Sequence, residues 1–191
     1  KKTYLVNGKN SIWNMSSALV YYNKTIFDDY SIKTPTEYIK ENNWTWDTFK
    51  KTMKEIASSD DSLLGASIDT NAFTRTYGGL WVDFNPDTDK FTNVSQNSQL
   101  LDTYKYILEA KEAGYATVSP NGVDSRFNKG EIGMALAGAY GLRATGWLTD
   151  MDPEDVAFAY MPKRNASDKS YPSGSTFRSY GVCKGSKNPV A

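Results

Sequence analysis

The stretch Ala18-Leu19-Val20-Tyr21-Tyr22 decides the kind of fold that this sequence can form. Aromatic and β-branched residues prefer extended backbone, so this apolar run predicts a buried strand. The segment that follows has a different character, because Thr34-Pro35-Thr36-Glu37 has the pattern of a helix start. Thr34 can cap the free amides, Pro35 suits the first turn, and Glu37 completes a capping box. A strand and a helix in close succession predict helices layered against a sheet.

Outward from this segment, extended and helical patterns alternate. A second helix begins near Thr45, with apolar residues at spacings of three and four: Trp46, Phe49, Met53, Ile56 and Ala57. The longest predicted helix covers 97–113, with an apolar stripe of Leu100, Leu101, Tyr104, Ile107 and Leu108. Other strands are predicted at 3–6, 63–68, 132–137, 156–160 and 177–183, with a hairpin over 81–92, short helices at 71–80, 120–130 and after 138, and a loop at 163–176. This alternation favours a mixed α/β layer architecture.

Composition excludes several classes of function. The 191 residues are 39% hydrophobic, which is enough for a core, and 22 basic residues balance 22 acidic ones. Without a basic excess, nucleic acid is not expected as the main partner. The absence of His excludes Ser-His-Asp catalysis, Cys-His catalysis and His-ligated metal sites, and the single Cys183 excludes a zinc cluster of cysteines and an internal disulfide. We expect no cofactor, and no run approaches the roughly 20 apolar residues that a membrane helix needs.

Acidic clusters suggest two further kinds of site. Adjacent carboxylates occur at Asp28-Asp29, Asp60-Asp61 and Glu154-Asp155, and solvated surface is the favoured interpretation because neighbours in sequence usually point apart. A glycosidase needs two carboxylates at a set separation, which a sequence does not give. The segment Asp83 to Asp89 places oxygen side chains at alternate positions, as calcium prefers, but it lacks the turn Gly and the Glu of an EF-hand loop. A polar hairpin tip is the simpler interpretation.

Aromatic residues are abundant, with 13 Tyr, 8 Phe and 5 Trp. Tyr and Trp combine a flat apolar face with a polar tip, and surfaces that bind polar ligands often use them. A Tyr-rich core explains the same composition, so the count alone leaves both interpretations open.

Three separated stretches resemble one family of proteins. They are residues 21–27 (Tyr-Tyr-Asn-Lys-Thr-Ile-Phe) with Thr34-Pro35 and 43–49 (Asn-Trp-Thr-Trp-Asp-Thr-Phe), residues 127–134 (Phe-Asn-Lys-Gly-Glu-Ile-Gly-Met) with Gly138-Ala139-Tyr140, and residues 156–162 with Gly174 and 180–188. In order and spacing, these motifs resemble the extracellular solute-binding proteins of family 1, the carbohydrate-type receptors of ABC importers that include the maltose-binding protein. Two positions depart from the family pattern, since Gly133 stands where Ala is common and Tyr140 where Trp is frequent.

The resemblance implies an α/β fold of two lobes joined by crossing strands, with the ligand clamped between the lobes. We expect this chain to be an excerpt of a longer protein that covers one lobe of such a periplasmic-binding-protein-like fold, with hinge-crossing strands at both ends. The expected division is hinge strands at 1–24, an α/β ligand-binding lobe at 25–160 and a return crossing segment at 161–191.

Tyr140 is the first candidate for contact with a sugar. It follows Gly138 at a predicted strand-to-helix turn, where α/β sheets open their ligand crevice, and the matching family position is commonly a stacking aromatic residue. Trp13, Asn14 and Ser16 lie just before the buried strand, on the segment expected to line the hinge and cleft. Packing of the Trp13 ring within the hinge is the alternative for that residue.

Two more candidates lie elsewhere in the chain. Trp81 could project into the cleft from a loop, and Arg178, beside the return crossing, could bond hydroxyls or a carboxylate. An ordinary surface position is the favoured interpretation of Arg178. Trp44 and Trp46 belong to the motif at 43–49 and are assigned to packing.

The resemblance implies a non-catalytic function, as the substrate-binding component of an ABC importer. Such a protein binds a sugar or oligosaccharide between its lobes and delivers it to the membrane permease subunits. It would work outside the cell membrane, either as a membrane-anchored lipoprotein or free in the periplasm. The alternatives are a carbohydrate-active enzyme, a lectin-like module, or a solute-binding protein for a ligand other than a sugar.

Overall fold

The apolar run at 18–22 forms the middle of β1 (Met15–Asn23), and the main sheet is built around this strand. The computed structural model describes residues 15–78, 81–85, 87–120, 122–139, 148, 150–173 and 175–177. The main sheet has the order β5-β2-β6-β1-β7, and β8 also pairs with β1. Its other strands are β2 (Leu64–Asp69), β5 (Ala116–Ser119), β6 (Ile132–Gly138), β7 (Val156–Ala159) and β8 (Ser175–Phe177).

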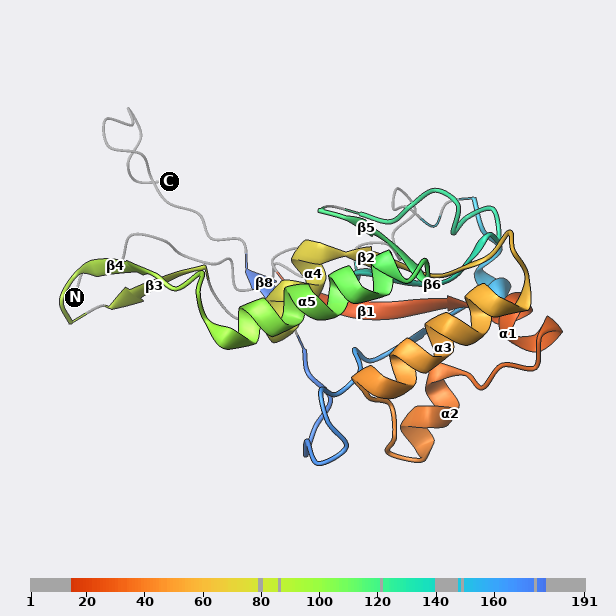
Figure 1. Ribbon diagram of the computed structural model, residues 1–191, viewed down its shortest axis with the longest axis horizontal. Coiled ribbons are helices and arrows are strands. Elements are labelled where there is room, and N and C mark those ends of the chain that lie inside the picture. Colours follow the sequence, from red (N-terminus) through yellow and green to blue (C-terminus); the bar gives the residue numbers. More distant parts are fainter. Residues whose placement is uncertain are drawn as a thin grey trace, which may run out of the picture.

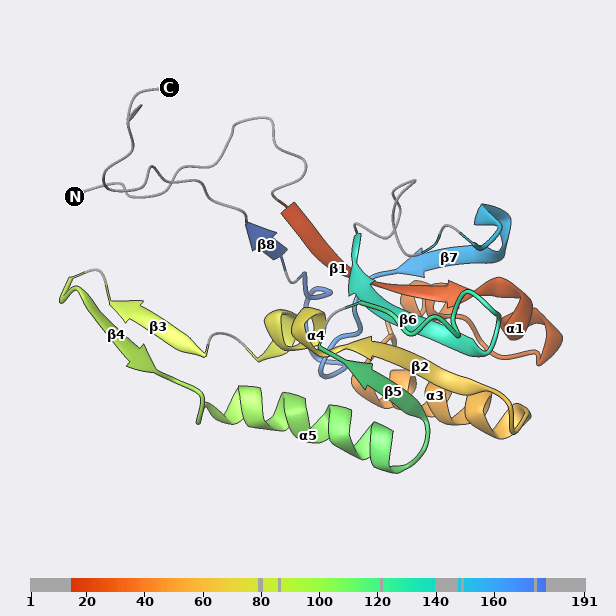
Figure 2. The ribbon, with the colours of Figure 1, turned by 90° about the horizontal axis from the view of Figure 1, so that it is seen from above.

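Five helices and a separate hairpin complete the described elements. The helices are α1 (Lys24–Asp29), α2 (Pro35–Lys40), α3 (Trp46–Ser59), α4 (Thr70–Tyr77) and α5 (Ser98–Glu112), with a 3-10 helix, η3 (Pro153–Asp155), before β7. The hairpin consists of β3 (Val82–Asn85) and β4 (Lys90–Asn93) and stands apart from the main sheet (Figures 1 and 2). None of the helices in the described ranges is long and apolar enough to cross a membrane.

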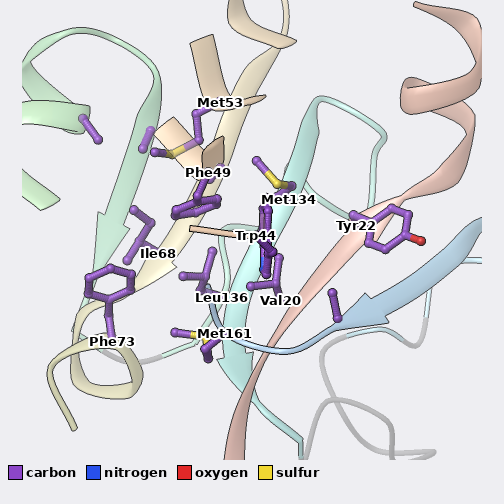
Figure 3. Close-up of a cluster of buried hydrophobic side chains, with 14 of the residues drawn as sticks. Val20, Tyr22, Trp44, Phe49, Met53, Ile68, Phe73, Met134, Leu136 and Met161 are labelled. Atoms are coloured by element: carbon purple, nitrogen blue, oxygen red, sulfur yellow. The ribbon is translucent and has the colours of Figure 1, made fainter. Parts of the chain in front are cut away.

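The larger part of the core lies between the sheet and the helical layer. Because side chains alternate in direction along each strand, the sheet also contributes to a second cluster on its other face. Val20 of β1 and Leu136 of β6 are buried in the larger hydrophobic cluster, which Trp44 and Phe49 fill from the helical side (Figure 3). Tyr21, between Val20 and Tyr22, belongs to a second cluster with Phe127 and Ala135. The sheet is therefore buried on both faces, as the predicted strand required.

Local sequence signals fix the helix starts. Thr34 caps α2 and Glu37 answers it in a capping box, as the sequence predicted. Thr45 caps α3, where Thr48 takes the place of the usual Glu or Gln. The predicted packing of the two Trp residues is also confirmed, since Trp44 is fully buried and the Trp46 ring lies 4.5 Å from that of Tyr106.

The segment after β7 is tied to the helical layer. Trp44 Nε1 donates to the backbone oxygen of Tyr160 over 2.8 Å. Lys163 is buried, and its Nζ donates to Asn42 Oδ1 over 2.6 Å. Arg164 Nη2 lies within hydrogen-bonding distance of three oxygens on α4 and α5: Tyr77 O at 3.0 Å, Gln99 O at 3.0 Å and Thr103 Oγ1 at 2.9 Å. The chain is thus held in place before it turns back towards β8.

The structure corrects two sequence predictions. On α5 the buried face is Leu100, Thr103, Tyr106, Ile107 and Ala110, whereas Leu101 and Leu108 are about half exposed. The predicted stripe was therefore centred one position away from the buried one. The predicted helix at 120–130 is also wrong, because the described residues there form turns whose amides bond to carbonyls three residues back. The predicted strand at 3–6, the helix after Ala139 and most of the strand at 177–183 lie outside the described residues.

We predict that Gly133→Ala destabilises the protein by about 1–3 kcal/mol, the usual cost of overfilling a packed core. A Cβ at Gly133 would lie 2.5 Å from Ile56 Cδ1, so α3 occupies the space that Ala needs. Urea denaturation measures the loss. Because Val lacks the Cδ1 atom, the double variant Gly133→Ala/Ile56→Val should be more stable than Gly133→Ala alone. Equal or lower stability of the double variant would contradict this explanation.

Candidate functional site

The sheet topology creates one edge suited to binding. β2 is parallel to both β5 and β6, so the carboxyl ends of these three strands meet at the same edge. The connection from β2 to β5 runs through α4 and α5 on the larger core's side, while the connection from β5 to β6 carries Phe127 of the second cluster. The chain therefore passes from β2 to β5 over one face of the sheet and from β5 to β6 over the other face. In open α/β sheets, ligands bind outside the carboxyl ends of the strands at such a point.

Asp69 organises this edge from the end of β2. It is only 4% exposed, and its two carboxylate oxygens accept from two different segments. Oδ1 accepts from the amide of Ala72 over 3.0 Å and caps α4, while Oδ2 accepts from the amide of Gly122 over 3.2 Å. The carboxylate therefore fixes the loop after β5 to the start of α4.

The two residues after Asp69 add further ties to the same loop. Thr70 Oγ1 donates to the backbone oxygen of Ser119 over 3.1 Å, and Asn71 Nδ2 donates to the backbone oxygen of Pro120. Tyr21, on β1 next to β6, donates from Oη to the backbone oxygen of Gly138 over 3.1 Å. Side-chain hydrogen bonds thus hold the carboxyl ends of β2, β5 and β6.

A charged pair lies on the loop that leads from this edge to β6. Arg126 Nη2 donates to Asp124 Oδ2 over 2.8 Å, and the amide of Asp124 donates to Ser67 Oγ over 2.9 Å. The hydrogen bond from Arg126 is the largest cause that lowers the pKa of Asp124 below its ordinary value. Because the folded state lowers this pKa, the pair stabilises the fold above the ordinary Asp range, and its contribution is lost as the pH falls through the lowered value.

The start of β1 and the strand β8 lie side by side. The first residues of β1 pair antiparallel with β8, in the register Met15 to Phe177, Ser16 to Thr176 and Ser17 to Ser175. This short ladder extends past the same side of the sheet as the carboxyl ends of β2 and β6 (Figure 2). Two adjacent strands that run in opposite directions next to a ligand edge are the geometry expected of a hinge.

The predicted site residues fall in different places. Ser16 is part of the β1–β8 ladder, where it pairs with Thr176, and its contact with a ligand stays a prediction. Trp81 is about half exposed, and its ring stands edge-on to Tyr104 with 5.6 Å between ring centroids. It directly precedes β3, at the base of the β3–β4 hairpin. Its contact with a ligand stays a prediction. The remaining candidates, Trp13, Asn14, Tyr140 and Arg178, lie outside the described residues.

Sequence reasoning missed the group Asp69, Thr70 and Asn71. A usable signal was present, because an apolar strand passes directly into a helix at Asp69, a preferred N-cap residue. A strand-to-helix junction of this kind marks the edge of an α/β sheet at which ligands bind. The junction at Asp69 could therefore have been used in the same way as the one predicted after Gly138. Within the described ranges, no group of three or more His, Cys, Asp and Glu residues could hold a metal ion.

Comparison with known families identifies the fold. The family described as "Bacterial extracellular solute-binding protein" matches residues 2–191. The chain belongs to this family. A search of curated proteins finds no match. The family and its solved members that resemble this chain are binding proteins, and the mixed α/β sheet matches one lobe of their fold.

Three solved structures illustrate the similarity. A β-1,6-galactobiose-bound protein of Bifidobacterium animalis subsp. lactis has a TM-score of 0.64 at 20% identity, over 98% of this chain and 45% of that chain. The GacH receptor of Streptomyces glaucescens, solved unliganded and with acarbose, has a TM-score of 0.62 at 18% identity, over 98% and 46%. UgpB of Mycobacterium tuberculosis, with glycerophosphocholine, has a TM-score of 0.57 at 17% identity, over 86% and 42%. This chain therefore spans less than half the length of these solute-binding proteins.

We predict that Asp69→Ala weakens the fold by about 1–3 kcal/mol, because buried amides of α4 and of the loop after β5 lose their acceptor. Chemical denaturation compares this variant with Asp61→Ala, which alters an exposed carboxylate. Hydrogen exchange should also become faster at the amides of Ala72 and Gly122. If the two variants are equally stable, Asp69 does not organise this edge.

Proposed function

We propose that this chain is the ligand-binding lobe of a substrate-binding component of an ABC importer, which binds a sugar or oligosaccharide and delivers it to membrane permease subunits. The observation that carries the proposal is the position of the β1–β8 ladder next to the tied carboxyl edge of β2, β5 and β6. A ligand at this edge would contact the rigid lobe and the crossing segments together. Its binding would then favour one relative position of two lobes over another.

The ligand would lie against Tyr140, with Trp13, Asn14, Ser16, Trp81 and Arg178 as further contacts. Planar polar groups would bond the hydroxyls, while aromatic faces would pack on the C–H surface of the sugar. Asp69 would hold α4 and the loop after β5 in position for these contacts, without touching the ligand. In this proposal the lobe covers 25–160 and the segments 1–24 and 161–191 provide the crossings, with the part of 1–24 that forms β1 also lying in the sheet of the lobe.

The sugar assignment draws support from relatives of the same fold. The GacH receptor has been solved with acarbose and the B. animalis protein with β-1,6-galactobiose. UgpB, with glycerophosphocholine, represents the alternative of a ligand other than a sugar. A carbohydrate-active enzyme or a lectin-like module is less well supported, because the family and these neighbours are binding proteins. We therefore propose a non-catalytic role, outside the cell membrane, as a lipoprotein or a free periplasmic protein.

The test is calorimetry of the full-length natural protein against mono- and oligosaccharides, with glycerophosphocholine included. Saturable binding of a sugar without its turnover supports the proposal. Preference for glycerophosphocholine would favour the non-sugar alternative, and hydrolysis of a glycoside would favour an enzyme.

We predict that Tyr140→Ala in the full-length protein weakens sugar binding by about 1–3 kcal/mol, because one stacking face is lost. Tyr140→Phe keeps the ring and should retain most of the affinity, which separates stacking from hydrogen bonding by the hydroxyl. Calorimetry measures the affinities, and circular dichroism confirms that both variants fold. Equal affinity of Tyr140→Ala and the wild type would contradict the assignment.

We predict that residues 1–191 alone have no useful sugar affinity. A lobe without its opposite wall lacks several hydrogen bonds of roughly 1 kcal/mol each and one stacking face, so a micromolar site would become millimolar or weaker. No family-typical sugar should raise the melting temperature of this chain in a thermal-shift screen. The aromatic surface that the other lobe would cover should favour self-association instead. Micromolar binding by this chain would mean that one lobe holds the complete site.

A further inference from the structure

The β3–β4 hairpin is amphipathic. Its register pairs Val82 with Asn93, Asp83 with Thr92, and Phe84 with Phe91. Because side chains alternate across a strand, one face carries Val82, Phe84 and Phe91 together with Asn93, and the other carries Asp83 and Thr92. The two Phe rings pack on each other with 4.8 Å between centroids. The hairpin therefore has one apolar face and one polar face.

The apolar face has no cover within the described part of the chain. Phe91 is 76% exposed, and Val82 and Phe84 are each close to half exposed. The two strands pair only with each other among the described strands, and the hairpin extends beyond the start of α5 (Figures 1 and 2). A two-stranded hairpin alone is at best marginally stable in water, and an apolar face normally needs a packing partner. Some other surface is therefore expected to cover these three side chains.

The chemistry of the face favours polypeptide over sugar as its cover. A sugar site combines stacking rings with polar groups that bond the hydroxyls. Here Asp83 and Thr92 belong to the opposite face of the hairpin, and Asn93, at the edge of the apolar face, already accepts from the amide of Ser95 over 2.9 Å. Val82, Phe84 and Phe91 instead offer the surface that apolar side chains of a helix or strand would cover.

The size of the face favours a covalently connected cover over a separate molecule. A fully exposed aromatic side chain presents 150–250 Å², so the open area of Val82, Phe84 and Phe91 is on the order of 300 Å². A stable interface between separate proteins needs about 800 Å² on each partner, because association costs translational and rotational freedom. A segment of the same polypeptide does not have that cost, so a small apolar face suffices to hold it.

The position of the hairpin is consistent with such a segment. The hairpin projects to the same side of the lobe as the first residues of β1 and as β8 (Figures 1 and 2). The B. animalis protein and GacH extend well beyond the region they share with this chain, which covers 45% and 46% of them. We propose that the face formed by Val82, Phe84 and Phe91 docks an apolar segment of the same polypeptide from outside residues 1–191.

Site-specific photocrosslinking of the full-length protein tests this proposal. A benzophenone amino acid replaces Phe91 in one variant and Thr92 in a matched control, whose side chain lies on the polar face. Mass spectrometry of the illuminated monomer should identify a crosslink from position 91 to a peptide outside residues 1–191, and several-fold less of it from position 92. Crosslinks to a second copy, to residues within 1–191 alone, or to no peptide would each overturn the proposal.

A second measurement does not depend on the crosslinker. In the full-length protein, Phe91→Ser should lower the melting temperature by a few degrees, whereas Thr92→Ser should leave it nearly unchanged. Equal melting temperatures of the two variants would overturn the proposal, because a covered Phe91 cannot be replaced without cost. Both measurements are made without ligand, so their outcome is independent of whether the protein binds a sugar.

Discussion

The close approach of α3 to the sheet is the constraint on which the rest of the lobe depends. A Cβ at Gly65 of β2 would lie 2.3 Å from the backbone oxygen of Met53, so helix and strand touch through their backbones. A side chain at this point could be accommodated only if the whole helix moved. Because the backbone of α3 lies so close to β2, Trp44 and Phe49 reach the centre of the larger core. The same contact fixes the position of the helical layer relative to the strands.

The position of the helical layer in turn determines the positions of two other segments. The segment after β7 is fixed to the helical layer by Trp44, Lys163 and Arg164, and the start of α4 is fixed to the loop after β5 by Asp69. The helical layer therefore connects the carboxyl edge of the sheet with the chain that approaches the β8 crossing. A displacement of α3 would therefore also move the segment after β7 and the start of α4, both of which lie away from Gly65.

Features determined by neighbouring residues could be predicted from the sequence, whereas features determined by distant ones could not. The cap of α2, the start of α3 near Thr45 and the strand at 18–22 rest on local pattern, and they were predicted correctly. The burial of Leu100 was predicted, but the exposure of Leu101 and Leu108 depends on how α4 and β5 flank α5, which no periodicity within one helix contains. The role of Asp69 depends likewise on Gly122, which is far away in sequence. For the candidate site, the sequence predicted ligand contacts near Gly138 and on the segment before β1, which stay predictions, but it did not indicate the hydrogen bonds of Asp69, Thr70 and Asn71.

The short ladder between β1 and β8 has a mechanical consequence. Met15 and Phe177 form its outermost pair within the described residues. Tension that separates the two connections would therefore act on one residue pair at a time and open the ladder like a zipper. The β1–β6 ladder starts at Ala18, further along the same strand, so the opening would reach a longer and better packed ladder after Ser17. In the proposed two-lobed protein, the connections would thus separate over a short, defined length while the lobe itself stays folded.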